Sequence, residues 1–171
     1  LAVDGAYAYD VSGFAPIRHV FTPGSTMKAI VMAIALDQEL VSPQESFQTF
    51  APKGVVVRDG RSARHIREAL GAPEESHIPA TEGLAHSVNA VLVQIGLRVP
   101  APVLRSKLLS LGYGSRPEIG LGPESGGHVP VLDRHGSWSR VYAHASVCFG
   151  HEVGVTLWQH ATALATLARG G

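Results

Sequence analysis

Apolar residues recur at the spacing of an α-helix in four parts of the chain, which predicts four helices. They span roughly 25–40, 80–99, 101–111 and 156–168. Pro23 and Gly24 lie just before the first predicted helix, and Pro100 prevents the second from continuing. Gly112 and Gly114 supply the glycine signal that commonly ends a helix such as the third.

The remaining segments predict little sheet. Residues 1–11 alternate apolar and small residues, which favours a strand. Residues 41–64 are interrupted by Pro, Gly and an Asp-Gly pair around a short valine run, so we expect loops with one small, peripheral hairpin. Residues 115–136 are rich in Gly and Pro and predict a long surface loop. The pattern indicates one helix-rich domain.

The amino-acid composition argues against several classes of protein. The 171 residues are 45% hydrophobic and carry a formal net charge of zero, which fits a globular domain and argues against disorder. No run of Lys or Arg gathers on one segment, so nucleic acid is not an expected partner. A single cysteine, Cys148, excludes an intrachain disulfide, and no apolar stretch is long enough to span a membrane.

Ser25 and Lys28 are the first candidate chemical groups. They lie three residues apart at the start of the first predicted helix, where their side chains are neighbours. A serine hydroxyl needs a base to become a good nucleophile, and a lysine desolvated in a cleft can lose its proton and act as that base. Backbone N–H groups at the start of the helix can stabilise a developing oxyanion.

The pair Ser-x-x-Lys occurs often by chance, and in isolation a capped helix with a surface lysine explains it better. Its context favours chemistry, because Pro23-Gly24 precedes it and Ser87-Val88-Asn89 follows on the second predicted helix. Together these groups predict acyl transfer through a serine ester. Taken alone, Ser87 would be a helix cap and Asn89 a solvent-facing helical residue.

The segment Phe-Thr-Pro-Gly-Ser-Thr-Met-Lys at 21–28 resembles the nucleophile segment of class B penicillin-binding proteins, the D,D-transpeptidases that cross-link bacterial peptidoglycan. Further segments resemble that family in the same order along nearly the whole chain. They are Ser87-Val88-Asn89, the Phe-Gly-Phe-Gly-like turn Leu111–Gly114, the loop Gly120–Ser125, Phe149-Gly150, Val155-Thr156 with Gln159, and Ala168–Gly171. The resemblance implies an α+β fold: the helix-rich part of the penicillin-binding-protein transpeptidase and β-lactamase-like fold.

The same resemblance implies a role for each candidate residue. Ser25 would be the acylated nucleophile and Lys28 its base, while Ser87 would relay a proton towards the leaving amine and Asn89 would hydrogen-bond the bound peptide. The implied partners are peptidoglycan stem peptides, β-lactam antibiotics and other membrane proteins of cell-wall synthesis. No cofactor is implied.

The third motif of the family, Lys-Thr/Ser-Gly, does not occur in the chain. We therefore interpret residues 1–171 as a partial transpeptidase domain that lacks most of its antiparallel sheet and is inactive alone. The resemblance also implies an anchor helix upstream, which would hold the protein on the periplasmic or outer face of the bacterial cytoplasmic membrane. Ala29, His151-Glu152 and Leu157-Trp158 depart from the family pattern, and we expect none of them to contact the proposed catalytic atoms.

Other chemistries fit less well. His151-Glu152 begins a zincin-like pattern, but the fifth position is Val155, so no metal site is predicted among the nine histidines. No Gly-x-Ser-x-Gly elbow of a Ser-His-Asp hydrolase occurs. The loop with Glu118 and Glu124 lacks the Glu-x-x-x-Asn pattern of class A β-lactamases; Glu124 is either a support for its own loop or a solvated carboxylate. A β-lactam sensor, a β-lactamase-like hydrolase and an inactive penicillin-binding pseudoenzyme remain as alternatives.

Overall fold

The computed structural model describes residues 15–59, 62–68, 73–138 and 141–170, so the strand predicted over 1–11 lies outside the described residues. The helical elements are α1 (Ala15–Arg18), the 3-10 turn η2 (Gly24–Thr26), α2 (Met27–Asp37), α3 (Ala80–Ala85), α4 (Asn89–Arg98), α5 (Ala101–Ser110), α6 (Val141–Cys148) and α7 (Leu157–Ala168). The strands are β1 (Val20–Phe21), β2 (Ser46–Gln48), β3 (Val55–Asp59), β4 (Ser62–Ile66), β5 (His77–Pro79) and β6 (Val155–Thr156).

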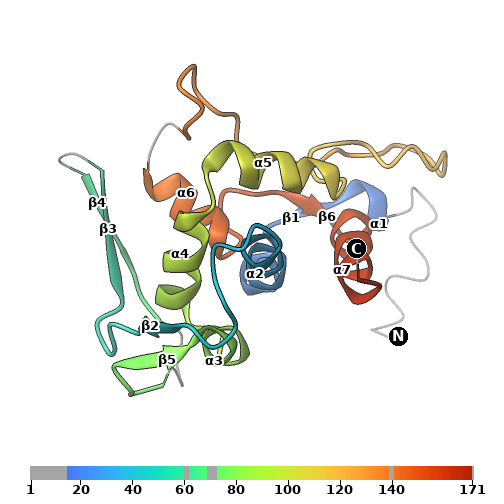
Figure 1. The fold of residues 1–171 in the computed structure, drawn as a ribbon. Helices are drawn as coiled ribbons and strands as arrows, with labels where there is room; N and C mark the ends of the chain where they lie inside the picture. The colour runs from blue at the N-terminus through green and yellow to red at the C-terminus, as the bar shows by residue number, and fades with distance from the viewer. Residues whose placement is uncertain (1–14, 60–61, 69–72, 139–140, 171) are drawn as a thin grey trace.

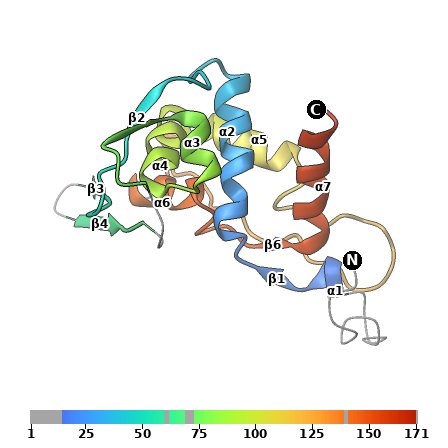
Figure 2. The same cartoon turned by 90° about the horizontal axis from the view of Figure 1, so that it is seen from below.

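Helix α2 lies at the centre of the molecule, with α4 on one side and α7 on the other (Figures 1 and 2). It packs against α3, α4, α5, α6 and α7. The large apolar side chains from Met27 to Ile34 are buried, as the regular spacing predicts, while Leu36 near the end of the helix is exposed. The main core therefore forms around this helix, and the start of α2 is held by neighbours on several sides.

The first predicted helix is confirmed, but it begins and ends differently from its prediction. Ser25 belongs to the tight turn η2, and the α-helix proper starts only at Met27. Gly24 opens the turn with a φ of 58°, a conformation that glycine adopts without strain. The helix ends at Asp37, two residues before Glu39, which has a φ of 55°.

The second predicted helix is wrong as a continuous element. It is divided into α3 and α4 by residues 86–88, and Ser87 has a φ of 56°. Helical spacing did not reveal the break because Val88 is fully buried and continues the apolar pattern across it. The predicted third and fourth helices are confirmed as α5 and α7, and α7 starts with a capping box between Thr156 and Gln159. Helix α6 was not predicted.

The strands form three separate antiparallel pairs: β1 with β6, β2 with β5, and β3 with β4. In the first pair Val20 lies opposite Thr156, which ties the segment before η2 to the start of α7. The third pair is the small hairpin predicted around the valine run, with Val57 opposite Arg64. Small antiparallel pairs on a mainly helical body confirm the α+β, helix-rich fold class.

Candidate active site

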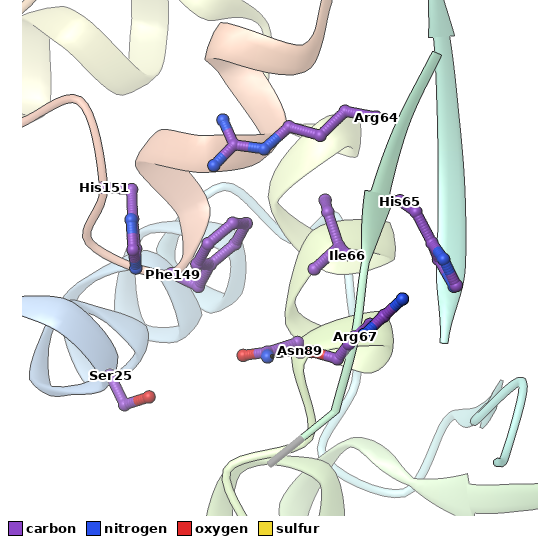
Figure 3. Close-up of a pocket in the computed structure, with 8 residues that line it drawn as sticks. All are labelled: Ser25, Arg64, His65, Ile66, Arg67, Asn89, Phe149 and His151. Carbon is purple, nitrogen blue, oxygen red and sulfur yellow. Dashed lines mark hydrogen bonds between the residues drawn. The ribbon is translucent and has the colours of Figure 1, made fainter. Parts of the chain in front are cut away.

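A pocket opens beside the start of α2, and four separate parts of the chain line it (Figure 3). Ser25 comes from η2, and Asn89 is the first residue of α4. The end of β4 and Arg67, which follows it, supply another wall, and Phe149 and His151 come from the segment after α6. Ser25 is exposed, and its hydroxyl and the Asn89 side chain extend from opposite sides of the pocket in Figure 3. The structure thus brings two of the four predicted site residues to one pocket.

Two glycines fix the turn that carries Ser25. The Gly24 N–H donates to the Gly150 carbonyl at 3.2 Å. Gly150 has a φ of 79°, and a Cβ added to it would lie 2.0 Å from the Gly24 carbonyl oxygen. The two backbones therefore touch in a way that only glycine at position 150 permits. This contact joins two segments, Pro-Gly-Ser and Phe-Gly, that the sequence showed only as separate matches.

Lys28 belongs to the first turn of α2 and is almost fully buried, with 1% of its surface exposed. Its Nζ donates to the Ser87 carbonyl at 2.5 Å and to the Ser87 Oγ at 2.9 Å. Burial lowers the pKa of Lys28 from 10.5 to about 8, against the opposing effect of the Glu68 carboxylate, which raises it. The predicted base is therefore a lysine that loses its proton far more readily than a solvated one.

The role of Lys28 as the base for Ser25 stays a prediction. Within the described residues, the hydrogen bonds of the ammonium go to Ser87, and none joins it to Ser25. Ser87 is also not the helix cap that its position in the sequence favours, because Val88 holds the N-cap position of α4. Instead its left-handed backbone turns both its carbonyl and its hydroxyl towards Lys28. Strained backbone of this kind is common at functional sites.

Asn89 is fixed by the residues that follow the hairpin. Its side-chain Nδ2 donates to the Arg67 carbonyl at 2.8 Å. The backbone N–H groups of Asn89 and Ala90 donate to the two carboxylate oxygens of Glu68, each at 2.6 Å. A carboxylate at this position satisfies the free N–H groups at the start of α4. Asn89 is thus a half-buried pocket residue, and its interpretation as a solvent-facing one is wrong.

The hairpin lies at the edge of the molecule, as predicted (Figure 1), but its strand β4 also lines the pocket, which was not predicted. Sequence reasoning also missed Glu68, which both caps α4 and acts electrostatically on Lys28. The cap acts across 21 residues and lies outside any periodic segment, so no local pattern could reveal it.

Arg64 and two aromatic rings form the side of the pocket next to α6. The guanidinium of Arg64 donates to Ser146 Oγ, lies 5.9 Å from the centre of the Phe149 ring, and is 3.7 Å from Glu152. The centres of the His151 and Phe149 rings lie 4.9 Å apart. His151 thus lines the same pocket as Ser25, nearer to the predicted site than we expected for a departure from the family pattern.

Two polar side chains hold the loop after α5. Glu124 accepts the N–H groups of Glu118 and Gly120 at 2.5 and 2.9 Å, which confirms its role as a support within the loop. The Nε2 of Gln159 in α7 lies 2.8–3.0 Å from the carbonyls of Gly112, Ser115 and Gly126, which share its two N–H donors. Across the described ranges, no three His, Cys, Asp or Glu side chains gather as a metal site would need, and no helix has the length and apolar character of a membrane span.

The model of the penicillin-binding protein transpeptidase domain matches residues 1–171. The chain belongs to this family. Two curated relatives of this transpeptidase domain are stage V sporulation protein D of Bacillus subtilis and the peptidoglycan D,D-transpeptidase FtsI of Escherichia coli K12. The first is 28% identical over 156 residues and the second 29% over 157, each match covering 91% of this chain. The matches cover 23% and 24% of the two relatives, so the chain spans about a quarter of their length.

Solved structures show the same fold for this transpeptidase domain chain. A peptidoglycan glycosyltransferase from Burkholderia ambifaria superposes with a TM-score of 0.79 at 23% identity, covering 95% of this chain and 48% of the other. Penicillin-binding protein A from Mycobacterium tuberculosis, solved as an imipenem acyl-enzyme complex, gives a TM-score of 0.75 at 24% identity, covering 96% and 37%. The chain therefore corresponds to less than half of each of these two solved chains.

Proposed function

We propose that this chain supplies the acylation centre of a peptidoglycan D,D-transpeptidase. The observation that carries the proposal is the buried Lys28, hydrogen-bonded to Ser87, two residues before Asn89, which lines one pocket together with Ser25. Ser25 Oγ attacks a peptide carbonyl of one stem peptide, forming an ester and releasing the amine of the departing residue. An amine of a second stem peptide then attacks the ester, which forms the cross-link and frees Ser25.

Lys28 is the base in this scheme. With a pKa of about 8, it is neutral in about one molecule in ten at pH 7, against fewer than about one in a thousand for a solvated lysine. A neutral amine has two N–H donors and one lone pair. The carbonyl oxygen and the Oγ of Ser87 accept hydrogen bonds from the two N–H groups of Lys28. The lone pair of Lys28 is then left to take the proton from Ser25 as the ester forms.

Ser87 and Asn89 serve the substrate in the same scheme. The Ser87 hydroxyl, 2.9 Å from Lys28, passes the proton to the amine that leaves. Asn89 hydrogen-bonds the backbone of the bound peptide from a position that Arg67 and Glu68 keep fixed. Residues 1–171 do not contain the Lys-Thr/Ser-Gly motif of the family that this chain resembles, so we expect these residues alone to be inactive.

The same nucleophile accounts for trapping by penicillin. Ser25 Oγ attacks the β-lactam carbonyl and opens the ring. The former ring nitrogen takes the proton lost by Ser25 and stays attached to the adduct. The Glu124 carboxylate accepts hydrogen bonds from the backbone of its own loop, so we assign no base in this loop that activates water. The ester is therefore expected to persist. The implied setting is the outer face of the bacterial cytoplasmic membrane, together with other membrane proteins of cell-wall synthesis. These last points rest on family membership.

Fluorescent penicillin labelling of the full-length protein tests the proposal. We expect a covalent adduct in the wild type, loss of the adduct in Ser25→Ala, and normal labelling in Ser42→Ala, which removes an exposed hydroxyl outside the pocket. An adduct that persists in Ser25→Ala contradicts the assignment, and a wild type without adduct indicates a pseudoenzyme.

A second assay separates the enzyme classes. A stem-peptide thioester donor and an amino-acid acceptor are incubated with the protein, and the exchanged peptide is measured by mass spectrometry. A transpeptidase forms the exchanged peptide; a sensor gives an adduct without exchange; a β-lactamase-like hydrolase turns over a chromogenic cephalosporin continuously. Either of the last two results contradicts the proposal.

A further inference from the structure

The turn that carries Ser25 is held from the other side by a buried hydrogen-bond chain. His160 of α7 and Tyr113, which follows α5, are 5% and 0% exposed. The Tyr113 hydroxyl lies 2.7 Å from His160 Nδ1, and His160 Nε2 lies 2.7 Å from the Thr26 Oγ1. Thr26 in turn donates its hydroxyl proton to the Pro23 carbonyl at 2.7 Å. The chain therefore runs from the loop after α5, through α7, to both ends of the turn around Ser25.

We propose that His160 is a positioning residue, which in its neutral form fixes the turn Pro23–Thr26 and so sets the direction of the Ser25 hydroxyl. The part of this proposal that concerns acylation of Ser25 rests on the proposed function, whereas the part that concerns the stability of the turn does not. Tyr113 supplies the hydroxyl at a place where the Phe-Gly-Phe-Gly turn that this segment resembles has a phenylalanine.

The number of available protons fixes which atom is the donor in each hydrogen bond between Tyr113, His160 and Thr26. Thr26 has a single hydroxyl proton and donates it to Pro23, so its oxygen accepts from His160. His160 must therefore carry its proton on Nε2, which leaves Nδ1 as an acceptor for the Tyr113 hydroxyl. Each polar atom is satisfied in this neutral tautomer.

A protonated imidazole does not fit the same chain. Its Nδ1–H would meet the Tyr113 hydroxyl, whose own proton would lose its acceptor in a fully buried place. Burial also lowers the pKa of His160 and raises that of Tyr113, which keeps the ring neutral and the phenol protonated. Protonation keeps the Nε2–H that His160 donates to Thr26 but breaks the hydrogen bond from Tyr113 to Nδ1. We therefore expect the ring to shift away from Tyr113, which disturbs its contact with Thr26 and loosens the turn.

The charged groups around His160 do not offset this effect. Tyr113 is the titratable side chain that it contacts, and Phe21 of β1, in an edge-on ring contact, carries no charge. Helices α1 and α2 also pack against α7. Lys28 of α2 directs its ammonium to Ser87, and Arg18 of α1 contacts the His19 ring.

The test is the pH profile of penicillin acylation in the full-length protein. The second-order rate of the wild type is expected to fall once as Lys28 is protonated and to steepen at lower pH as His160 is protonated. His160→Gln, whose amide can donate to Thr26 without titrating, is expected to keep the neutral-pH rate within about fivefold and to lose the second fall. Tyr113→Phe is expected to move the second fall to higher pH, because it removes a hydrogen bond to the neutral ring. A purely structural role would change the rate at all pH values equally.

Two controls complete the design. His135→Asn, which replaces an exposed histidine outside the pocket, is expected to leave the profile unchanged. His151→Asn shows whether the pocket histidine causes the second fall instead. The proposal is overturned if the second fall persists in His160→Gln, or if Tyr113→Phe leaves it in place.

Thermal unfolding provides a measurement that does not depend on acylation. Because the folded pKa of His160 lies below its unfolded value, its contribution to stability is present above that unfolded value, about 6.5, and is lost as the pH falls below it. The melting temperature of the wild type relative to His160→Gln is therefore expected to fall as the pH is lowered from about 7.5 to about 5. A constant difference overturns the proposal, even if Ser25 proves not to be acylated.

Discussion

The backbones of Gly24 and Gly150 are in direct contact. The Gly24 N–H donates to the Gly150 carbonyl, and Gly150 approaches the Gly24 carbonyl so closely that no side chain fits between them. Residues far apart in the chain thus position the turn before Ser25. Because both glycines have positive φ values, the contact depends on conformations that other residues rarely adopt.

Gly150→Ala is expected to destabilise the protein by about 2–4 kcal/mol and to slow acylation at Ser25, because the added Cβ would lie 2.0 Å from the Gly24 carbonyl oxygen. Gly120→Ala is the matched control, since Gly120 has a φ of 73° but open space around it. Gly120→Ala is expected to lower the stability by about 1 kcal/mol, because the new residue meets no clash and only its positive φ is unfavourable. Melting temperatures and labelling rates check both variants, and equal effects would show that the Gly24–Gly150 contact does not matter.

The rate of acylation is expected to depend on pH through Lys28. As the pH rises through about 8, Lys28 loses its proton and the rate of penicillin labelling should increase to a plateau. Glu68→Gln removes the negative charge that favours the protonated lysine, so this rise should move to lower pH. Rates measured between about pH 6 and about pH 10 check the shift. A rise that stays in place, or moves to higher pH, contradicts the electrostatic role of Glu68.

Lys28 is expected to cost stability. Its folded pKa lies below its unfolded value of 10.5, so its contribution to stability is greatest above that value and is lost as the pH falls towards about 8. Below that range the protein carries the penalty of a buried charge. Lys28→Met is therefore expected to abolish labelling but to raise the stability at pH 7 by about 1–3 kcal/mol. Met32→Lys, which places a new lysine at another buried position of α2, should do the opposite to stability. A lower melting temperature for Lys28→Met contradicts this balance.

Local patterns predicted the elements well where one face of a helix is apolar. Helices α5 and α7 follow from the spacing of their buried face, and α2 follows from a regular apolar run although it is buried on several sides. The same spacing failed between α3 and α4, since Val88 is buried on the shared face and conceals the break at Ser87. An element whose interruption keeps the apolar period cannot be divided by periodicity alone.

The candidate site was predictable only in part, for a related reason. Short motifs identified Ser25, Lys28, Ser87 and Asn89, whose roles remain predictions. Contacts such as those of Glu68 with α4, or of His160 with Thr26, join residues that are distant in the chain. They arise from packing around α2, and no spacing rule in the sequence encodes them.

Gln159 is expected to be essential for holding the loop after α5 to α7. Its Nε2 lies within hydrogen-bond distance of the carbonyls of Gly112, Ser115 and Gly126, which share its two N–H donors, and the side chain is 3% exposed. Gln159→Ala leaves these carbonyls without their partner, so we expect a loss of about 2–3 kcal/mol in stability. Gln44→Ala, at an exposed position, should have almost no effect. Melting temperatures check the difference, and limited proteolysis should show faster cleavage within 115–126 in Gln159→Ala alone. Similar stability for both variants would mean that the loop is held by other contacts.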